Sequence, residues 1–148
     1  MIRRARPPDR GTVEAIVAAA YAIYVERIGK KPGPMLDDYR RLIAAGAVSV
    51  LEEPAATIAA LIVLLPKSDH LLLDNIAVRP DRQGQGIGRR LIDFAESEAR
   101  RLGYVELRLY THVTMIENIG LYQHLGFHET GRRHEDGYDR VFMTKPLI

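Results

Sequence analysis

Hydrophobic and polar positions follow two different periods along the chain, and each change of period predicts a change of element. Between Val13 and Tyr24, apolar residues recur at intervals of three and four, which is typical of one face of a helix. We expect this helix to begin at Asp9 or Thr12 and to end at Gly29. The same N-terminal region predicts a short strand and a second, shorter helix, at Ile2–Ala5 and Asp37–Ala45.

Three apolar, β-branched runs follow with no helical pattern between them. They span Ala47–Glu52, Thr57–Leu65 and His70–Val78. Successive strands without intervening helices predict an antiparallel meander. The third run is interrupted by the polar pair Asp74-Asn75.

Helical spacing returns after Val78. The clearest helix in the sequence is expected over Gly88–Leu102, and Gly103 supplies its C-terminal cap. The strand Tyr104–Tyr110 is reached through this helix, so we expect it to lie parallel to the strand that ends at Val78. A further helix and a final hairpin are predicted at Thr114–Leu125, Phe127–Arg132 and Tyr138–Met143.

These elements predict a single mixed α/β (α+β) domain over residues 1–148. Its sheet is expected to be mostly antiparallel, with one parallel strand pair and about four helices. The sequence shows no internal repeat, low-complexity segment or linker between domains.

Composition narrows the possible partners. Hydrophobic residues make up 47% and charged residues 27%, which is ordinary for a globular protein, and a net charge of +2 is too small to indicate nucleic-acid binding. The absence of cysteine excludes disulfides, thiolate catalysis and cysteine-type zinc sites. The longest apolar stretch, Ile58–Leu65, is too short to cross a bilayer, and the N-terminus has no secretory pattern. We therefore expect a cytoplasmic protein that contacts no membrane.

A glycine-rich bend separates the third strand of the meander from the long helix. Gly84, Gly86 and Gly88 would let the backbone approach a ligand closely, and the helix start behind them presents unpaired N–H groups. Such a helix start favours a phosphate or pyrophosphate. The alternative is a strand-to-helix turn whose glycines only relieve crowding. Two standard phosphate loops do not fit, because Arg89 and Arg90 occupy positions that those loops require to be glycine, lysine, serine or threonine.

Two motifs resemble the signatures of the GNAT superfamily of acyl-CoA N-acyltransferases. The first is Asn-Ile-Ala-Val-Arg-Pro at 75–80 followed by Gln-Gly-Gln-Gly-Ile-Gly at 83–88, and the second is Asn-Ile-Gly-Leu-Tyr-Gln-His-Leu-Gly-Phe at 118–127. Their order and the elements between them also match, over roughly Ala47–Lys145. The resemblance implies the acyl-CoA N-acyltransferase fold, in which the parallel strand pair splays apart. It also implies transfer of an acetyl group from acetyl-CoA to an amine.

The same resemblance implies where the co-substrate acetyl-CoA binds. Its pantetheine arm would bond to the backbone of the strand ending at Val78, and the glycine bend would hold its pyrophosphate. Arg82, Arg89 or both would add positive charge, whereas Arg90 is expected to be solvated. The implied cofactor-binding residues are Ile76, Ala77, Val78, Gln83, Gly84, Gln85, Gly86, Ile87, Gly88, Arg89, Asn118 and Tyr122.

Tyr122 is the candidate proton donor to the departing thiolate. Met115, Asn118 and Tyr122 fall on one face of the predicted helix, which would direct a phenol and an amide into the splay. Asn118 would bond to the CoA arm or orient Tyr122, or else lie on the surface, and Tyr122 could instead be a core aromatic residue. Many members of the superfamily carry an asparagine at the position that Met115 occupies here.

Asp74 is the candidate catalytic base, since it interrupts an apolar strand where burial could raise its pKa. Strand alternation places it on the same face as Leu72 and Ile76. Glu52 and His112 are rival bases, and Asp74 could instead pair with an arginine. An amine of low pKa would need no dedicated base.

The acceptor is a small-molecule amine or a protein amine that the sequence does not identify. The segment Tyr21–Tyr39 is either a lid over that acceptor or a solvated connection. No metal is expected, because Gly126 breaks the helix that would align His124 with His128. A homodimer is the assembly that we consider for this chain.

The sequence is compatible with three functions, of which acetyl transfer to an amine is the first. The absence of cysteine favours direct attack by the amine in a ternary complex over a thiol relay. The alternatives are a non-catalytic acyl-CoA-binding module and an N-acyltransferase that uses a longer acyl chain, for which the space near Met115 and Leu73 would be decisive.

Overall fold

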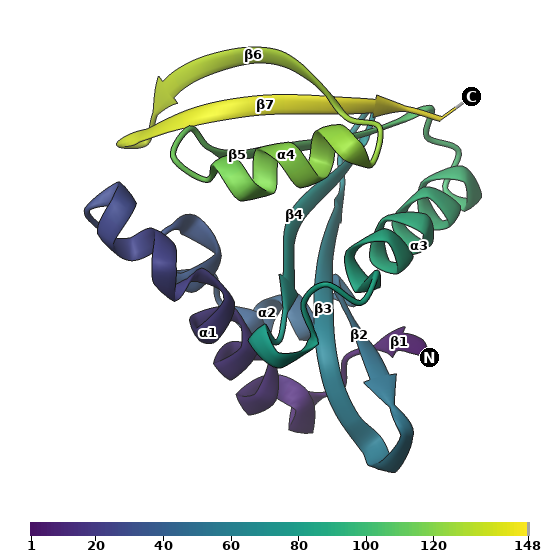
Figure 1. The fold of residues 1–148 in the computed structure, drawn as a ribbon. Helices are drawn as coiled ribbons and strands as arrows, with labels where there is room; N and C mark the ends of the chain where they lie inside the picture. The colour runs from purple at the N-terminus through teal and green to yellow at the C-terminus, as the bar shows by residue number, and fades with distance from the viewer. Residues whose placement is uncertain (148) are drawn as a thin grey trace.

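Seven strands form one sheet, and four helices cover its two faces (Figure 1). The computed structural model describes residues 1–147. The helices are α1 (Arg10–Ile28), α2 (Tyr39–Ala44), α3 (Ile87–Arg101) and α4 (Ile116–His124). The strands are β1 (Ile2–Arg4), β2 (Val48–Glu53), β3 (Thr57–Pro66), β4 (Leu71–Val78), β5 (Glu106–His112), β6 (His128–Glu135) and β7 (Tyr138–Pro146).

The order of strands in the sheet is β1-β2-β3-β4-β5-β7-β6. All neighbouring strands are antiparallel except β4 and β5, which are parallel because α3 carries the chain across between them. This arrangement confirms the predicted fold class, with its mostly antiparallel sheet, its single parallel pair and its four helices.

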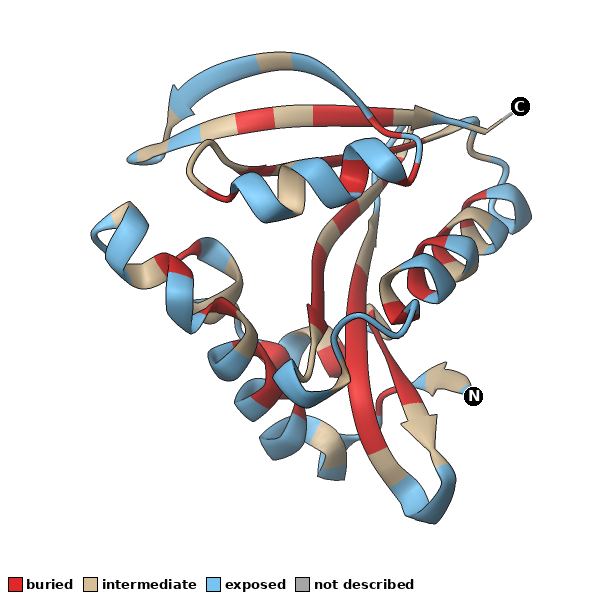
Figure 2. Ribbon diagram, viewed as in Figure 1, coloured by how far each residue is buried: buried red, intermediate tan, exposed pale blue. Residues whose placement is uncertain are grey.

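Each face of the sheet has its own apolar core (Figure 2). In β3, Ile62 packs toward α3 and α4, whereas Leu61 and Val63 pack toward α1 and α2, as alternation in a strand requires. Buried residues of the helices complete the two cores, among them Leu91 on α3 and Val17 on α1. Within residues 1–147, none of the helices combines the length and the apolar composition that a membrane crossing needs.

The parallel pair separates soon after it forms. β4 and β5 are paired at Leu71 with Leu107 and at Leu72 with Arg108, and the pairing goes no further. The later part of β4 and the end of β5 therefore present backbone groups that no neighbouring strand uses, which matches the splay that the resemblance implied.

A β-bulge in β4 marks the start of this separation. Asn75 is paired with Val63 of β3 and Leu73 with Leu64, so Asp74 between them has no partner on β3. The bulge shifts the alternation by one residue, because Leu73 and Ile76 pack in the same core although they are three residues apart. The expectation that alternation places Asp74 on the face of Ile76 is therefore wrong.

Several element boundaries differ from those predicted. α4 begins at Ile116, with Met115 at its N-cap, so Met115 lies at the end of the helix and not on its face. β5 begins at Glu106, since the N–H of Tyr104 donates to the last turn of α3. The final hairpin turns at Asp136 and Gly137, where φ is 54° and 80°, as a two-residue type I′ turn requires.

Replacing Leu91 by alanine tests the packing of α3 on the sheet. Leu91 is fully buried, so the cavity that Leu91→Ala leaves should lower the free energy of unfolding by about 2–5 kcal/mol in urea titrations. The control is Val105→Ala, at a side chain 71% exposed, where a change within about 0.5 kcal/mol is expected. Equal effects of the two substitutions would contradict the described packing.

Candidate active site

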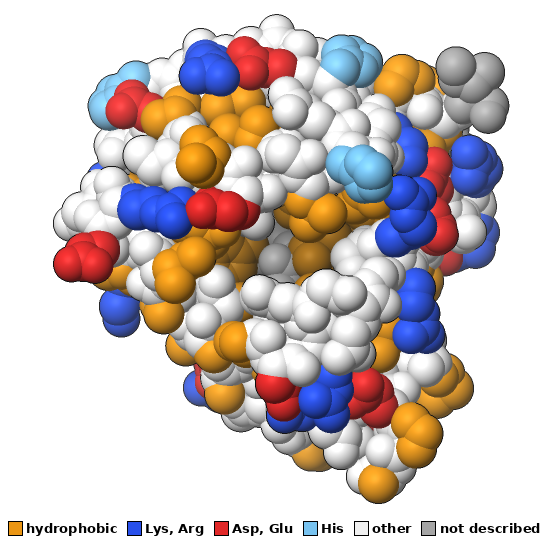
Figure 3. Space-filling view, viewed as in Figure 1, with side chains coloured by type: hydrophobic (Ala, Val, Ile, Leu, Met, Phe, Trp, Pro, Cys, Tyr) orange, Lys and Arg blue, Asp and Glu red, His pale blue; other side chains and the backbone are white. Residues whose placement is uncertain are grey.

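A groove of about 480 Å³ lies between the glycine bend, the end of β4 and α4, and we call it the glycine-bend groove. The space-filling view shows a hollow with apolar side chains in its wall on this side of the molecule (Figure 3). The predicted cofactor-binding residues that line the groove are Ile76, Val78, Gln83, Gly84, Gly86, Ile87, Gly88, Arg89, Asn118 and Tyr122. The other two, Ala77 and Gln85, are not among its lining residues, and the side chain of Ala77 packs in the core on the α1 side.

The backbone of the bend has the conformation that its glycines permit. Gly84 and Gly86 have φ of 79° and 76°, in the left-handed region that side chains with a Cβ rarely adopt. Gly86 is the N-cap of α3, and the first helical bond runs from Arg90 N–H to the Gly86 carbonyl at 3.2 Å. The three N–H groups before Arg90 therefore have no acceptor in the helix, and such groups form an anion site.

The three arginines near the bend differ in what they contact. Arg82 forms ion pairs with Glu53 at 3.0 Å and with Asp81 at 3.1 Å, so much of its charge is already matched. Arg89 lines the groove and forms no ion pair within residues 1–147. Arg90 is not a lining residue, in keeping with the solvated position expected for it. Arg89 is thus the cation best placed to meet an anion in the groove.

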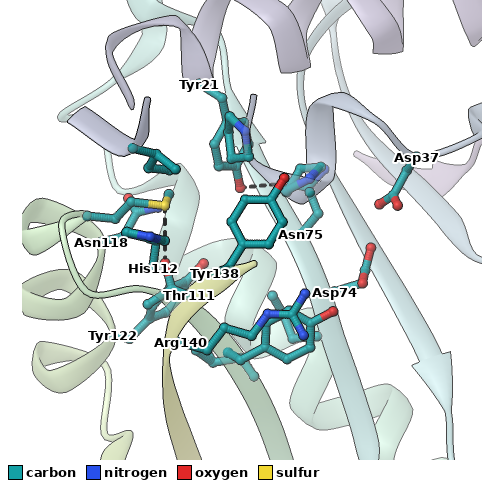
Figure 4. Close-up of a pocket in the computed structure, with 18 residues that line it drawn as sticks. Tyr21, Asp37, Asp74, Asn75, Thr111, His112, Asn118, Tyr122, Tyr138 and Arg140 are labelled. Carbon is teal, nitrogen blue, oxygen red and sulfur yellow. Dashed lines mark hydrogen bonds between the residues drawn. The ribbon is translucent and has the colours of Figure 1, made fainter. Parts of the chain in front are cut away.

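A second, smaller cavity of about 80 Å³ lies where β4 and β5 separate, bordered by α1, α4 and β7, and we call it the tyrosine cavity (Figure 4). Asn118 and Tyr122 line both this cavity and the glycine-bend groove. The other polar side chains that line the tyrosine cavity are Tyr21, Asp37, Asp74, Asn75, Tyr110, Thr111, His112, Tyr138 and Arg140. Tyr21 of α1 lines both spaces as well, so the two share a wall formed by residues of α1 and α4.

Tyr122 is a buried residue whose ring packs edge-on against Phe127 at 5.7 Å between centroids. Burial is the main cause that raises its pKa above the ordinary value, so the phenol keeps its proton at neutral pH. Its hydroxyl forms no hydrogen bond with any other group of residues 1–147, which leaves the proton available to a bound molecule.

The three candidate bases lie in different surroundings. Glu52 forms an ion pair with Arg3 at 2.9 Å and lines neither space. His112 lines the tyrosine cavity, but its Nδ1 accepts from the Thr114 N–H at 3.2 Å, and burial lowers its pKa. Asp74 lines the same cavity. It forms no ion pair with an arginine of the described chain, so the alternative that Asp74 only pairs with an arginine finds no support.

Nowhere in residues 1–147 do three His, Asp or Glu side chains gather closely enough to hold a metal ion.

Asp37 is a site residue that the sequence interpretation missed. It lines the tyrosine cavity, and its carboxyl group faces that of Asp74 (Figure 4). Burial and the neighbouring Asp74, by hydrogen bonding and charge repulsion, raise the pKa of Asp37 to about 7. The sequence did contain a signal, because two adjacent aspartates, Asp37 and Asp38, precede α2 and a helix needs only one of them as its N-cap. The structure gives that role to Asp38, whose side chain accepts from the Arg41 N–H at 3.3 Å.

Asn75 connects β4 to both helices of the α1 side. Its side-chain oxygen accepts from the Tyr21 hydroxyl at 2.6 Å, and its nitrogen donates to the Tyr39 hydroxyl at 2.9 Å. The Tyr21 hydroxyl also lies 3.0 Å from the Ile76 carbonyl. With an exposed fraction of 2%, Asn75 is held inside the protein by these bonds.

The connection between α1 and α2 reaches across to the other half of the molecule. The Tyr138 hydroxyl of β7 donates to the Lys31 carbonyl at 2.7 Å, and the Lys30 ammonium lies 4.0 Å from the centroid of the Tyr138 ring. Arg27 forms an ion pair with Glu117 of α4 at 2.6 Å. These contacts favour the interpretation of this segment as a cover over the tyrosine cavity.

Taken together, the structure is that of an α/β protein with a separated parallel strand pair, a helix start with free N–H groups, and two adjoining spaces that share Tyr122. The family model described as "Acetyltransferase (GNAT) domain" matches residues 44–129, which is more than half of the chain. The chain belongs to the GNAT acetyltransferase family.

Relatives of known activity match over part of their length. The [ribosomal protein bS18]-alanine N-acetyltransferase of Escherichia coli (strain K12) is 36% identical over 85 residues, which cover 53% of this chain and 57% of the relative. The IAA acetyltransferase of Azospirillum brasilense is 42% identical over 72 residues, or 47% of each chain. The chain thus spans about half the length of the curated relatives it matches.

Solved structures match over nearly the whole chain. The ribosomal-protein-S18-alanine N-acetyltransferase from Escherichia coli has a TM-score of 0.74 at 25% identity, covering 99% of this chain and 93% of that one. The PaiA N-acetyltransferase from Thermoplasma acidophilum, in complex with coenzyme A, has a TM-score of 0.80 at 18% identity, covering 99% and 98%. The second likeness concerns the fold alone.

The left-handed backbone of Gly86 can be tested by a pair of glycine substitutions. Gly86→Ala places a Cβ where φ is 76°, which should lower the free energy of unfolding by about 1–2 kcal/mol. Gly120→Ala, in an exposed part of α4, should instead raise it by about 0.5–1 kcal/mol. Urea titration of both variants measures the difference, and a Gly86→Ala protein as stable as the parent would contradict the described bend.

Proposed function

We propose that the chain transfers an acetyl group from acetyl-CoA to a primary amine by direct attack in a ternary complex. The observation that carries this proposal is the shared wall: Tyr21, Asn118 and Tyr122 border both the glycine-bend groove and the tyrosine cavity. A donor in one space and an acceptor in the other would meet at the Tyr122 hydroxyl. Membership of the GNAT family supports the same activity.

Acetyl-CoA is the donor that the glycine-bend groove suits best. Its pyrophosphate would lie against the free N–H groups at the start of α3, with Arg89 beside it. Its pantetheine arm would follow the edge of β4 at Ile76 and Val78 that faces away from β3, where pairing with β5 has ended. The PaiA enzyme, whose structure is named as a complex with coenzyme A, shares the fold.

The acyl transfer then needs a neutral amine and a proton for the leaving thiolate. Asp74 would take a proton from the amine, and Tyr122, whose phenol stays protonated at neutral pH, would give one to the thiolate sulfur. The chain has no cysteine that could form an acyl-enzyme thioester, which supports direct attack. The small tyrosine cavity between Leu73 and Met115 favours acetyl over a longer acyl group.

The acceptor is a primary amine on a small molecule or on a protein. Relatives are named for either kind, since one acts on an alanine of ribosomal protein bS18 and another is named an IAA acetyltransferase. A cavity of about 80 Å³ would admit the amine-bearing end of an acceptor and leave its remainder outside. Location in the cytoplasm and assembly as a homodimer stay predictions from the sequence.

Tyr122→Phe tests the proton donor. Removal of the hydroxyl should lower kcat by about 10²–10⁴-fold, because the thiolate would leave without its acid, while calorimetry should show unchanged acetyl-CoA binding. The matched control is Tyr104→Phe, which removes a hydroxyl that bonds to the Lys67 carbonyl far from either space and should keep full activity. The assay is thiol release from acetyl-CoA with the best acceptor from an amine screen. Unchanged turnover in Tyr122→Phe would remove Tyr122 from the mechanism.

Calorimetric titration with acetyl-CoA separates the remaining alternatives. Heat of binding together with amine-dependent thiol release supports the transferase, whereas binding without release from any amine would indicate a non-catalytic acyl-CoA-binding module. Absence of binding to both acetyl-CoA and CoA would rule out the proposed donor site.

A further inference from the structure

Asp37 lies on the connection between α1 and α2, and it brings a second carboxyl group to the wall of the tyrosine cavity that Asp74 occupies. We propose that Asp37 and Asp74 act as a pair, which receives the acceptor as a single ammonium ion and takes its proton before attack. This inference rests on the proposed function and deepens it, since it assigns the amine-binding group and the charge of the acceptor.

The position of the pair is the first support. Both carboxyl groups line the same small cavity as Tyr122, and neither lines the glycine-bend groove. An amine held by the pair would therefore approach the shared wall from the acceptor side. Figure 4 shows Asp37 and Asp74 next to each other at one side of the cavity, with Arg140 and Tyr138 from β7 nearby.

The pair is held in place by a chain of buried hydrogen bonds. Asn75, which directly follows Asp74, donates to the Tyr39 hydroxyl, and this hydroxyl in turn donates to the carbonyl of Pro34. Tyr39 and Pro34 flank Asp37 along the sequence. One side-chain amide thus links the β4 bulge to the segment that carries Asp37, which sets the two carboxyl groups opposite each other.

The charges around the pair leave it without a cation. Neither carboxyl forms an ion pair within residues 1–147. Arg140 lines the same cavity, but its guanidinium bonds to Glu135 at 2.9 Å and lies 4.4 Å from the Tyr110 ring centroid. The titratable and charged groups that face the pair are Tyr21 from α1, Tyr39 from α2, Tyr110 and His112 from β5, Tyr122 from α4, and Tyr138 and Arg140 from β7. Burial raises the pKa of the Tyr21, Tyr39 and Tyr110 phenols, so these stay neutral. An incoming ammonium would supply the missing positive charge.

The proton balance of the step follows from this arrangement. The ammonium gives one proton to the pair, and the resulting amine nitrogen forms a bond to the thioester carbonyl carbon. The carbon–sulfur bond then breaks, the thiolate takes the Tyr122 proton, and the Tyr122 phenolate takes the second proton from the new amide nitrogen. The proton on the pair is released to solvent as the product leaves. The raised pKa of Asp37, about 7, suits a group that gains and loses a proton near neutrality.

The same arrangement specifies the class of acceptor. The ionised pair receives one ammonium group and keeps a single negative charge once it has taken the proton from that group. A carboxylate close to the amine would be repelled by the pair, and a second cation nearby would meet the positive charge of Arg140. We therefore expect a simple primary amine or a peptide N-terminus, and neither a free amino acid nor a polyamine.

Carbon-13 NMR of the full chain labelled at its aspartate carboxyl carbons tests the pair directly. One carboxyl, absent from the Asp37→Asn spectrum, should titrate with a midpoint near 7, and Asp74→Asn should move that midpoint to lower pH. In the parent protein, propylammonium chloride should also lower the midpoint of Asp37, because it binds the ionised pair. β-Alanine and sodium chloride at equal concentration should leave that midpoint unchanged. An ordinary midpoint for Asp37, or no response to propylammonium, would overturn the inference.

Kinetics of the same variants separate this inference from the proposed function. Asp37→Asn should bind acetyl-CoA as the parent does, lose about 100-fold in kcat/KM for the amine, and lose the rise of kcat/KM with pH near 7. The matched control, Asp93→Asn on the exposed side of α3, should keep the parent profile. Normal acetyl-CoA binding with an unchanged Asp37→Asn profile overturns the inference alone, whereas loss of acetyl-CoA binding by the parent protein overturns the proposed function.

Thermal melting gives an independent check without any ligand. Because the folded pKa of Asp37 is raised, its contribution to stability is present below the unfolded pKa near 3.8 and is lost as the pH rises through about 7. Asp37→Asn should therefore raise Tm at pH 8 relative to the parent and should raise it less, or not at all, at pH 5. A shift in Tm that is the same at both pH values would contradict the buried carboxyl pair.

Discussion

The buried amide of Asn75 is the interaction on which the rest of the site depends. It anchors the bulge in β4 to Tyr21 of α1 and to Tyr39 of α2 with both ends of its side chain. A buried amide has few ways to satisfy its donors and its acceptor, so this arrangement fixes the strand and the helices relative to each other. The bulge, the end of strand pairing and the placement of Asp37 all lie within this network.

The separation of β4 from β5 creates two spaces of opposite electrostatic character. In the glycine-bend groove, the free N–H groups at the start of α3 and Arg89 favour an anion. In the tyrosine cavity, two carboxyl groups among neutral phenols favour a cation. Tyr122, whose raised pKa keeps its phenol neutral, lines both spaces. In the proposed mechanism, an anionic donor and a cationic acceptor would each be drawn to its own space.

The connection between α1 and α2 combines two roles. It carries Asp37 into the tyrosine cavity, and it closes against β7 through Tyr138 and against α4 through Arg27. The family model does not extend over this part of the chain, since its match begins at residue 44. The proposed recognition of the acceptor would therefore depend on a segment that lies outside the part of the chain matched by the family model.

The sequence by itself determined the elements and the glycine bend, because those features depend on local spacing. Helical periodicity predicted α1 and α3, and the alternating glycines predicted a bend whose left-handed residues are Gly84 and Gly86. The tertiary structure decided which side chains meet in the tyrosine cavity. The bulge at Asp74 depends on the register with β3, and Asp37 meets Asp74 although 36 residues separate them in the chain. No local pattern records such a pairing, since it is set by how α1 and α2 pack on the sheet through the hydrogen bonds of Asn75.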